Sequence, residues 1–69
     1  QFNVPEKAMK DIQILIIEDE KILRENIAEI ITHYDFRAIT ASSGEEGVKM
    51  AAQFSPDIIV CGIMLPGIN

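Results

Sequence analysis

The sequence has only one cysteine, and its 6 basic residues are outnumbered by 11 acidic ones. A single thiol, Cys61, cannot form an intramolecular disulfide, whereas secreted domains of this size usually need several. The net charge of −5, without a cluster of Lys or Arg, disfavours contact with a phosphate backbone, so we expect no direct nucleic-acid partner. These shortages favour a reducing, cytoplasmic setting.

Long apolar runs are also missing. None approaches the roughly 18–20 residues of a membrane span, and the N-terminus lacks the basic start and apolar stretch of a signal peptide. We therefore expect no membrane partner. The 69 residues allow at most one small domain, and a hydrophobic content of 48% is that of a globular protein rather than a disordered one.

What is present is an alternation of short apolar runs with helical patterns. Residues 1–10 contain a proline and no clear period, which predicts a flexible N-terminal arm ahead of a domain over 11–69. Residues 12–17 form a nearly continuous β-branched apolar run, as in a strand buried on both faces of a parallel sheet. Residues 36–41 are more mixed and suit an edge strand, whereas 58–61 again resemble a buried strand.

Two helices are predicted between these strands. The first has apolar residues at helical spacing and ends near Asp35, a residue type that tolerates left-handed backbone. The second begins at a capping box, in which Ser43 accepts from the helix backbone and Glu46 reaches back to the Ser43 amide, and it ends near Gln53. The residues expected to face inward are Leu23, Ile27, Ile30, Ile31 and Tyr34 in the first helix, and Val48, Ala51 and Ala52 in the second. The β-α-β-α-β order predicts an α/β fold with a parallel sheet and right-handed crossovers.

Glu18, Asp19 and Glu20 directly follow the first predicted strand, at the sheet edge where ligands of open parallel sheets bind. Paired carboxylates there suit Mg²⁺, although helix capping and surface charge are the commoner explanation for such a pair. They argue against a dinucleotide site or a P-loop, which would place glycines at this position.

Three segments together resemble the receiver domain of two-component response regulators: Ile-Leu-Ile-Ile-Glu-Asp-Glu at 14–20, Ala-Ser-Ser-Gly-Glu-Glu-Gly at 41–47, and Pro-Asp-Ile-Ile-Val-Cys-Gly-Ile-Met-Leu-Pro-Gly-Ile-Asn at 56–69. The resemblance implies a flavodoxin-like fold with strand order 2-1-3-4-5, an acidic pocket for Mg²⁺, and an aspartate phosphorylated by a histidine kinase. It assigns Glu18 and Asp19 to the acidic pair and gives Met64 a metal contact through its backbone carbonyl.

Gly62 departs from the family, because the resemblance places the phosphate-accepting aspartate there. Glycine has neither a nucleophilic carboxylate nor a metal ligand, so we expect no phosphorylation, weak or absent Mg²⁺ binding and no enzymatic activity. The later family elements do not follow within the 69 residues. We therefore expect a truncated half-domain with strand order 2-1-3, in which the strand Ile58–Cys61 lacks a neighbour and pairs two chains as a homodimer.

Two alternatives remain open from the sequence. The chain could be an engineered variant of a working phosphorelay receiver, or a small α/β ligand-binding domain unrelated to phosphorelay. Among single residues, His33 suits a partly exposed position at a helix C-terminus better than a phosphorelay role. Cys61 suits a small buried hydrophobe better than a redox sensor.

Overall fold

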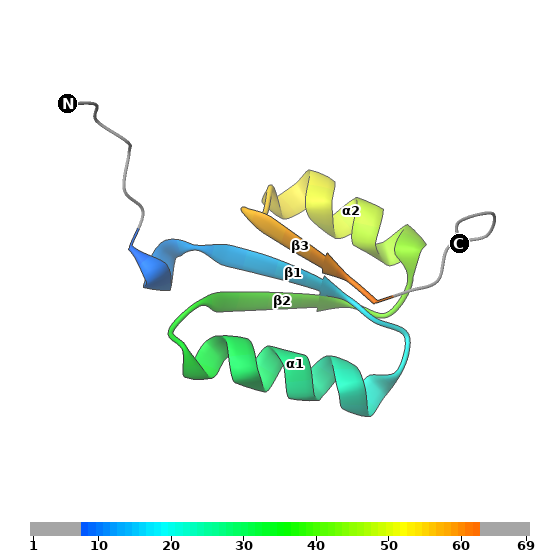
Figure 1. Ribbon diagram of the computed structural model, residues 1–69. Helices are drawn as coiled ribbons and strands as arrows, with labels where there is room; N and C mark the ends of the chain where they lie inside the picture. The colour runs from blue at the N-terminus through cyan, green and yellow to red at the C-terminus, as the bar shows by residue number, and fades with distance from the viewer. Residues whose placement is uncertain (1–7, 63–69) are drawn as a thin grey trace.

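Three parallel strands form the sheet, in the order β2-β1-β3. The computed structural model describes residues 8–62. Strand β1 (Gln13–Ile17) lies in the centre, between β2 (Arg37–Ala41) and β3 (Ile58–Cys61). The α/β class and the order 2-1-3 that the sequence predicts are confirmed, as is the edge position of the second strand (Figure 1). The predicted arm at 1–10 lies largely outside the described residues, and its end enters a short 3-10 helix, η1 (Met9–Asp11).

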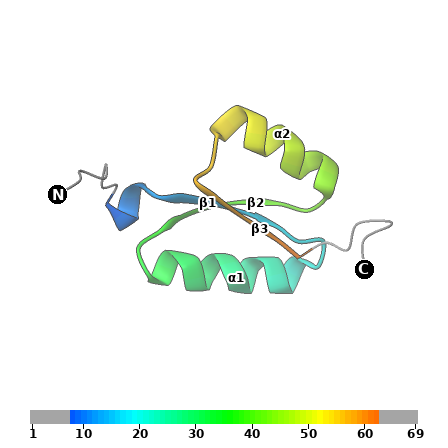
Figure 2. The same cartoon turned by 45° about the horizontal axis from the view of Figure 1, so that its top comes forward.

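The two helices lie on opposite faces of the sheet, as both views of the ribbon show (Figures 1 and 2). Helix α1 (Lys21–His33) and helix α2 (Gly44–Phe54) each pack chiefly on β1 and β2. This arrangement follows from the parallel pairing, because each crossover must carry the chain back across one face of the sheet. Strand β3 consequently receives little cover from either helix.

Local signals set the ends of the helices. The Glu20 carboxylate accepts a hydrogen bond from the Ile22 amide at 2.7 Å and caps α1 at its start. After α1, Asp35 takes a φ of 70°, the left-handed conformation expected at that residue. At the start of α2, the Ser43 hydroxyl accepts from the Glu46 amide at 3.1 Å, as predicted. The return bond differs from the prediction, since Glu46 accepts from the Ser42 amide at 2.6 Å.

The core is built around β1. Leu15 and Ile16 have no exposed surface, and Ile14, Ile17 and Ala41 are also buried. The near-continuous apolar run thus marks the central strand correctly. Parallel strands covered on both faces need such a sequence, because neither set of alternating side chains reaches water.

The prediction that the third strand is equally buried is wrong. Ile58 is 47% exposed and Ile59 is 52% exposed, and Val60 and Cys61 are also exposed. The apolar sequence is that of an interior strand, but β3 is an edge strand here. Both helices pack on β1 and β2 and leave β3 largely uncovered. The expectation of a buried Cys61 thiol fails for the same reason.

The predicted inward faces of the helices are also wrong in part. Leu23 and Ile30 of α1, and Tyr34 directly after it, lie at the surface although their spacing is that of a core stripe. In α2, Val48 is 71% exposed, and the buried position is the preceding residue, Gly47. The apolar face of each helix is wider than the part of the sheet that it covers, so the apolar residues at the margins of that face stay exposed. The exposed Ala52 lies on this uncovered side of α2 as well.

Candidate functional site

The candidate site lies where β1 and β3 end side by side. Ile17 pairs with Cys61 in the sheet register, so the residues that follow them, Glu18 and Gly62, meet at the same edge. The Gly62 amide donates a hydrogen bond to the Ile17 carbonyl at 2.8 Å. Sites in open parallel sheets lie beyond these carboxyl ends, because backbone groups and loops converge there. The sequence prediction that these two segments meet is therefore confirmed.

Glu18 is held in place by three hydrogen bonds. Its carboxylate Oε2 accepts from the Glu20 amide at 2.9 Å. Its own amide donates to the Ala41 carbonyl at 3.0 Å, and its carbonyl accepts from Arg24 Nη1 at 2.9 Å. Only 5% of Glu18 is exposed, which makes it the one buried charged residue in the described part of the chain. Of these three bonds, only the one from the Glu20 amide reaches the buried carboxylate and offsets part of its loss of water.

The Glu18 carboxylate also lies directly over Gly62. A Cβ placed on Gly62 would overlap Glu18 Oε1 and would stand 3.3 Å from Glu18 Cδ. No strained backbone accounts for the glycine, because the positive-φ region is not used at this position. The open space beside Gly62 is what admits the Glu18 side chain.

The other acidic residues of the predicted cluster are not buried at this edge. Asp19 is exposed, and the Glu20 carboxylate is engaged in capping α1. Within residues 8–62, no group of three or more His, Cys, Asp or Glu side chains is arranged to hold a metal ion. Met64, whose carbonyl the family resemblance assigns to the metal, lies outside the described residues. The geometry thus brings together Glu18 and Gly62, with Asp19 next to them in the chain.

Sequence reasoning missed the contact between Ser42 and Glu46 beside this edge. Both the amide and the hydroxyl of Ser42 donate to Glu46 Oε1, the hydroxyl at 3.1 Å. The backbone hydrogen bond, then the hydroxyl bond, and then the charges of Arg24 and Lys49 lower the pKa of the exposed Glu46 carboxyl below its ordinary value of 4.5. A capping-box pattern shifted by one residue could have indicated this contact, since both Ser42 and Ser43 precede the helix.

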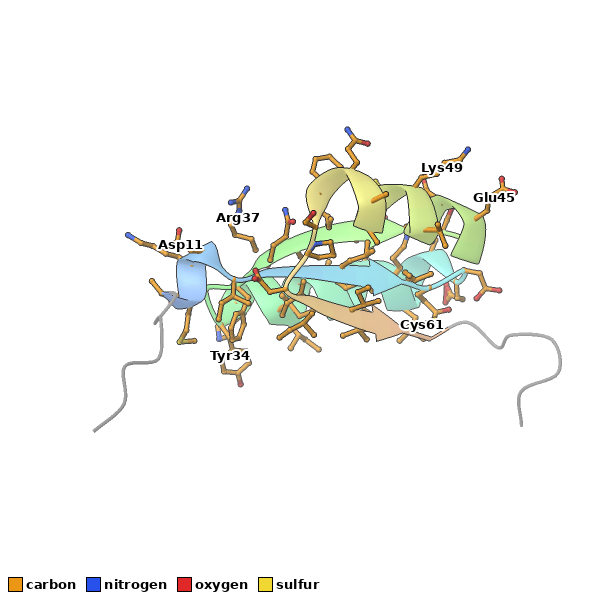
Figure 3. The ribbon with its side chains drawn as sticks, turned by 90° about the horizontal axis from the view of Figure 1, so that it is seen from above. Asp11, Tyr34, Arg37, Glu45, Lys49 and Cys61 are labelled. Carbon is orange, nitrogen blue, oxygen red and sulfur yellow. The ribbon has the colours of Figure 1, made fainter. Side chains whose placement is uncertain are left out.

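Two other candidate regions lie away from the carboxyl ends of the strands. The Asp57 carboxylate accepts a hydrogen bond from the Gln13 amide at 2.8 Å at the start of β1 and β3, the end of the sheet opposite to Glu18 and Gly62. His33 and Tyr34 stack edge to face, with ring centroids 5.3 Å apart. Together with Glu29 and Ile30 they border an open surface depression of about 540 Å³. Figure 3 shows Tyr34 and Asp11 toward one end of the molecule and Cys61 toward the other.

The architecture defines a class of protein: an open parallel α/β sheet of the flavodoxin-like kind, with an acidic residue after the first strand. The profile of the family described as the response regulator receiver domain matches residues 14–69. This chain therefore belongs to the response regulator receiver domain family. Receiver domains generally bind Mg²⁺ at an acidic pocket and interact with histidine kinases.

Relatives of known name support the same family. The chain is 41% identical over 56 residues to the transcriptional regulatory protein AfsQ1 of Streptomyces coelicolor, covering 81% of this chain and 25% of that protein. It is 37% identical over 57 residues to the response regulator ArlR of Staphylococcus aureus, covering 83% and 26%. It is 34% identical over 59 residues to the positive alginate biosynthesis regulatory protein of Pseudomonas aeruginosa, covering 81% and 24%. The chain spans about a quarter of the length of these relatives. In the described part of the chain, neither helix is long and apolar enough to cross a bilayer.

Proposed function

We propose that this chain is a receiver domain segment that does not accept phosphate and acts in two-component signalling as an interaction or assembly module. The observation that carries the proposal is Gly62, which follows β3 at the edge where Glu18 follows β1. In the family assignment this is the position of the acceptor aspartate. Glycine supplies no carboxylate, so no acyl phosphate can form there. The role is that of a non-enzymatic signalling module.

Among residues 8–62, no other side chain at this edge is placed to replace the missing acceptor. Glu18 is buried and engaged through Oε2, and Asp57 lies at the opposite end of the strands. Asp19 is exposed and belongs to the acidic pair in the family assignment. The proposal therefore treats the family's phosphate chemistry as lost in this chain, while the fold around it is kept.

The metal proposal is a weak Mg²⁺ site or none. Hard oxygen ligands are what Mg²⁺ prefers, and it commonly takes one or two carboxylates together with water. Glu18 and Asp19 would supply them, with the backbone carbonyl of Met64 as the third contact. Only Asp19 presents its carboxylate openly, because Oε2 of Glu18 already accepts from the Glu20 amide. A bound ion would supply positive charge that attracts negatively charged oxygen atoms of a ligand.

The partner proposal is a second copy of the chain, paired through the strand Ile58–Cys61. Strand β3 lies at the sheet edge, and its residues are exposed despite an apolar sequence. An edge of this kind is a template for pairing with another strand. Pairing about a two-fold axis would continue the sheet across both chains. A histidine kinase is the partner that the family implies, and a cytoplasmic location with no nucleic-acid or membrane contact completes the proposal.

Exposure to a small phosphodonor tests the proposal. We expect the chain, incubated with acetyl phosphate and Mg²⁺, to show no hydroxylamine-labile acyl phosphate by intact mass. The Gly62→Asp variant restores the carboxylate, and Gly62→Asn is its matched control with the same shape and no nucleophile. Phosphorylation of the unaltered chain would overturn the proposal. Labelling that disappears in Asp57→Asn or Asp19→Asn would identify the residue that had been overlooked.

A further inference from the structure

Glu18 fills the space that a side chain on Gly62 would need. The overlap involves Oε1, the oxygen that lies over Gly62, while Oε2 accepts from the Glu20 amide. One carboxylate thus spans from the end of β3 to the first residues before α1. The side chain is 5% exposed although it follows the last residue of a strand. A glutamate with no structural role at a sheet edge would place its charge in water.

We propose that Glu18 and Gly62 form a lock that closes this end of the sheet and fixes the start of α1. Because Gly62 has no side chain, the Glu18 carboxylate can occupy the space beside it. From there it accepts a hydrogen bond from the Glu20 amide. Glu20 in turn caps α1 by accepting from the Ile22 amide at 2.7 Å. Any group that enters the space beside Gly62 must displace Glu18, and the Glu20 amide then loses its acceptor.

A glycine is needed at position 62 because it leaves room for the Glu18 carboxylate, and not because the backbone there has an unusual conformation. The φ angle of Gly62 lies outside the left-handed region that L-residues avoid, so alanine fits the backbone itself. The Gly62 amide donates to the Ile17 carbonyl at 2.8 Å, and this bond does not depend on the side chain. The atom that a Cβ meets is the far end of a flexible side chain, which can rotate away. An added methyl group is therefore expected to open the lock without unfolding the sheet.

The lock gives the proposed function a structural consequence. In the family assignment the acceptor aspartate lies at this edge, whereas here the space beside residue 62 is occupied by the chain's own Glu18 carboxylate. The inference rests on the proposed function only where it links the Glu18 contact to the loss of phosphate acceptance. The contact between Glu18 and Gly62 exists whatever chemistry the site has, so its test uses neither phosphate nor Mg²⁺.

NMR on the full chain tests the lock through the Glu20 amide. We expect Gly62→Ala to speed solvent exchange of that amide about tenfold, the change that corresponds to losing one hydrogen bond. Gly44→Ala is the matched control, because a Cβ on Gly44 meets nothing within 4 Å. It should leave the exchange rate within about twofold, a change too small for a lost hydrogen bond.

Variants at Glu18 separate the lock from a general loosening. Glu18→Ala should speed exchange at Glu20 as much as Gly62→Ala does, and combining the two should add nothing. Unchanged exchange at Glu20 in Gly62→Ala, or additive effects in the double variant, would overturn the lock. In the unaltered chain, nuclear Overhauser contacts between the Gly62 α-protons and the Glu18 γ-protons are required. Their absence overturns the proposal even where a variant fails to fold.

Discussion

Gly47 packs against Ile17 so closely that the helix α2 and the strand β1 have no room for a methyl group between them. A Cβ on Gly47 would overlap Ile17 Cδ1 and would stand 2.8 Å from Ile17 Cγ1. Gly47 is the one buried residue of α2, and Ile17 is 7% exposed. The helix propensity of glycine, which costs roughly 1 kcal/mol relative to alanine, is thus offset by the close approach it allows.

We expect Gly47→Ala to destabilise the fold by about 1–3 kcal/mol, the usual range for overpacking a filled core. On an exposed helix the same change would stabilise. Gly44→Ala supplies that comparison, because it adds the same methyl group in open space and should stabilise by up to about 1 kcal/mol. Urea unfolding of both variants measures the two effects. Equal stability of the two variants would contradict the proposed packing.

Shortening Ile17 tests whether this one contact causes the cost. Ile17→Val removes the Cδ1 methyl group and alone should cost about 0.5–1.5 kcal/mol. In the Gly47→Ala background it removes the atom that a Cβ overlaps. We therefore expect a double-mutant cycle to show favourable coupling of about 0.5 kcal/mol or more. Additive losses would place the strain elsewhere.

The pH dependence of stability should include a contribution from Glu46. Hydrogen bonds from the Ser42 amide and hydroxyl, aided by Arg24 and Lys49, lower the pKa of Glu46 below 4.5 in the folded chain. A carboxyl with a lowered folded pKa stabilises above its unfolded pKa, and that stability is lost as the pH falls through the folded pKa. The stability difference between the unaltered chain and Glu46→Gln should therefore be present at neutral pH and vanish in acid.

Site-resolved titration of Glu46 checks whether the hydrogen bonds from Ser42 lower its pKa. Ser42→Ala removes the hydroxyl donor and keeps the amide donor, so it should raise the pKa of Glu46 part of the way toward its ordinary value. Added salt should change this pKa little, because the two hydrogen bonds are short-range and only the contributions of Arg24 and Lys49 are screened. A titration of Glu46 above 4.5 would contradict the observed geometry.

Self-association should depend on the strand β3. We expect the chain to sediment as a dimer and Ile59→Lys to shift it to monomer, because a charge on an exposed edge strand opposes pairing. Thr40→Lys is the matched control on the other edge strand, β2, where the residue is also exposed. Analytical ultracentrifugation over a range of concentrations gives the answer. Dissociation by Thr40→Lys alone would move the interface to β2, and a concentration-independent monomer would refute self-association.

Magnesium binding should be weak and should respond to charge at residue 62. We expect Gly62→Asp to tighten Mg²⁺ about tenfold or more, since affinity for hard cations rises with the number of carboxylates. Gly62→Asn should not do so, although it displaces Glu18 equally. Asp19→Ala should abolish the remaining affinity, whereas Glu29→Ala removes an exposed carboxylate of α1 and should leave it unchanged. Calorimetric titration that shows tight binding in Asp19→Ala would exclude the assigned ligands.

The order and type of the elements were determined by the sequence alone. The apolar run at 12–17 marked the central strand, because a strand covered on both faces cannot alternate with polar residues. Asp35 and the Ser43 hydroxyl marked helix ends through local backbone chemistry. The placement of Glu18 and Gly62 at one edge followed from the parallel order of the strands. The helix ends depend on neighbours in the chain, and the meeting of the two strand ends depends only on the order of the elements, both of which the sequence contains directly.

The tertiary structure decided what no local pattern could specify. The exposure of β3 depends on where two helices lie, and the apolar run at 58–61 is the same whether or not a neighbour covers it. The closeness of Gly47 to Ile17 depends on the distance between helix and sheet, which a propensity scale does not contain. The position of the Glu18 carboxylate over Gly62 arises because two residues far apart in the chain share one small space. Steric exclusion between such residues exists only once the chain is folded.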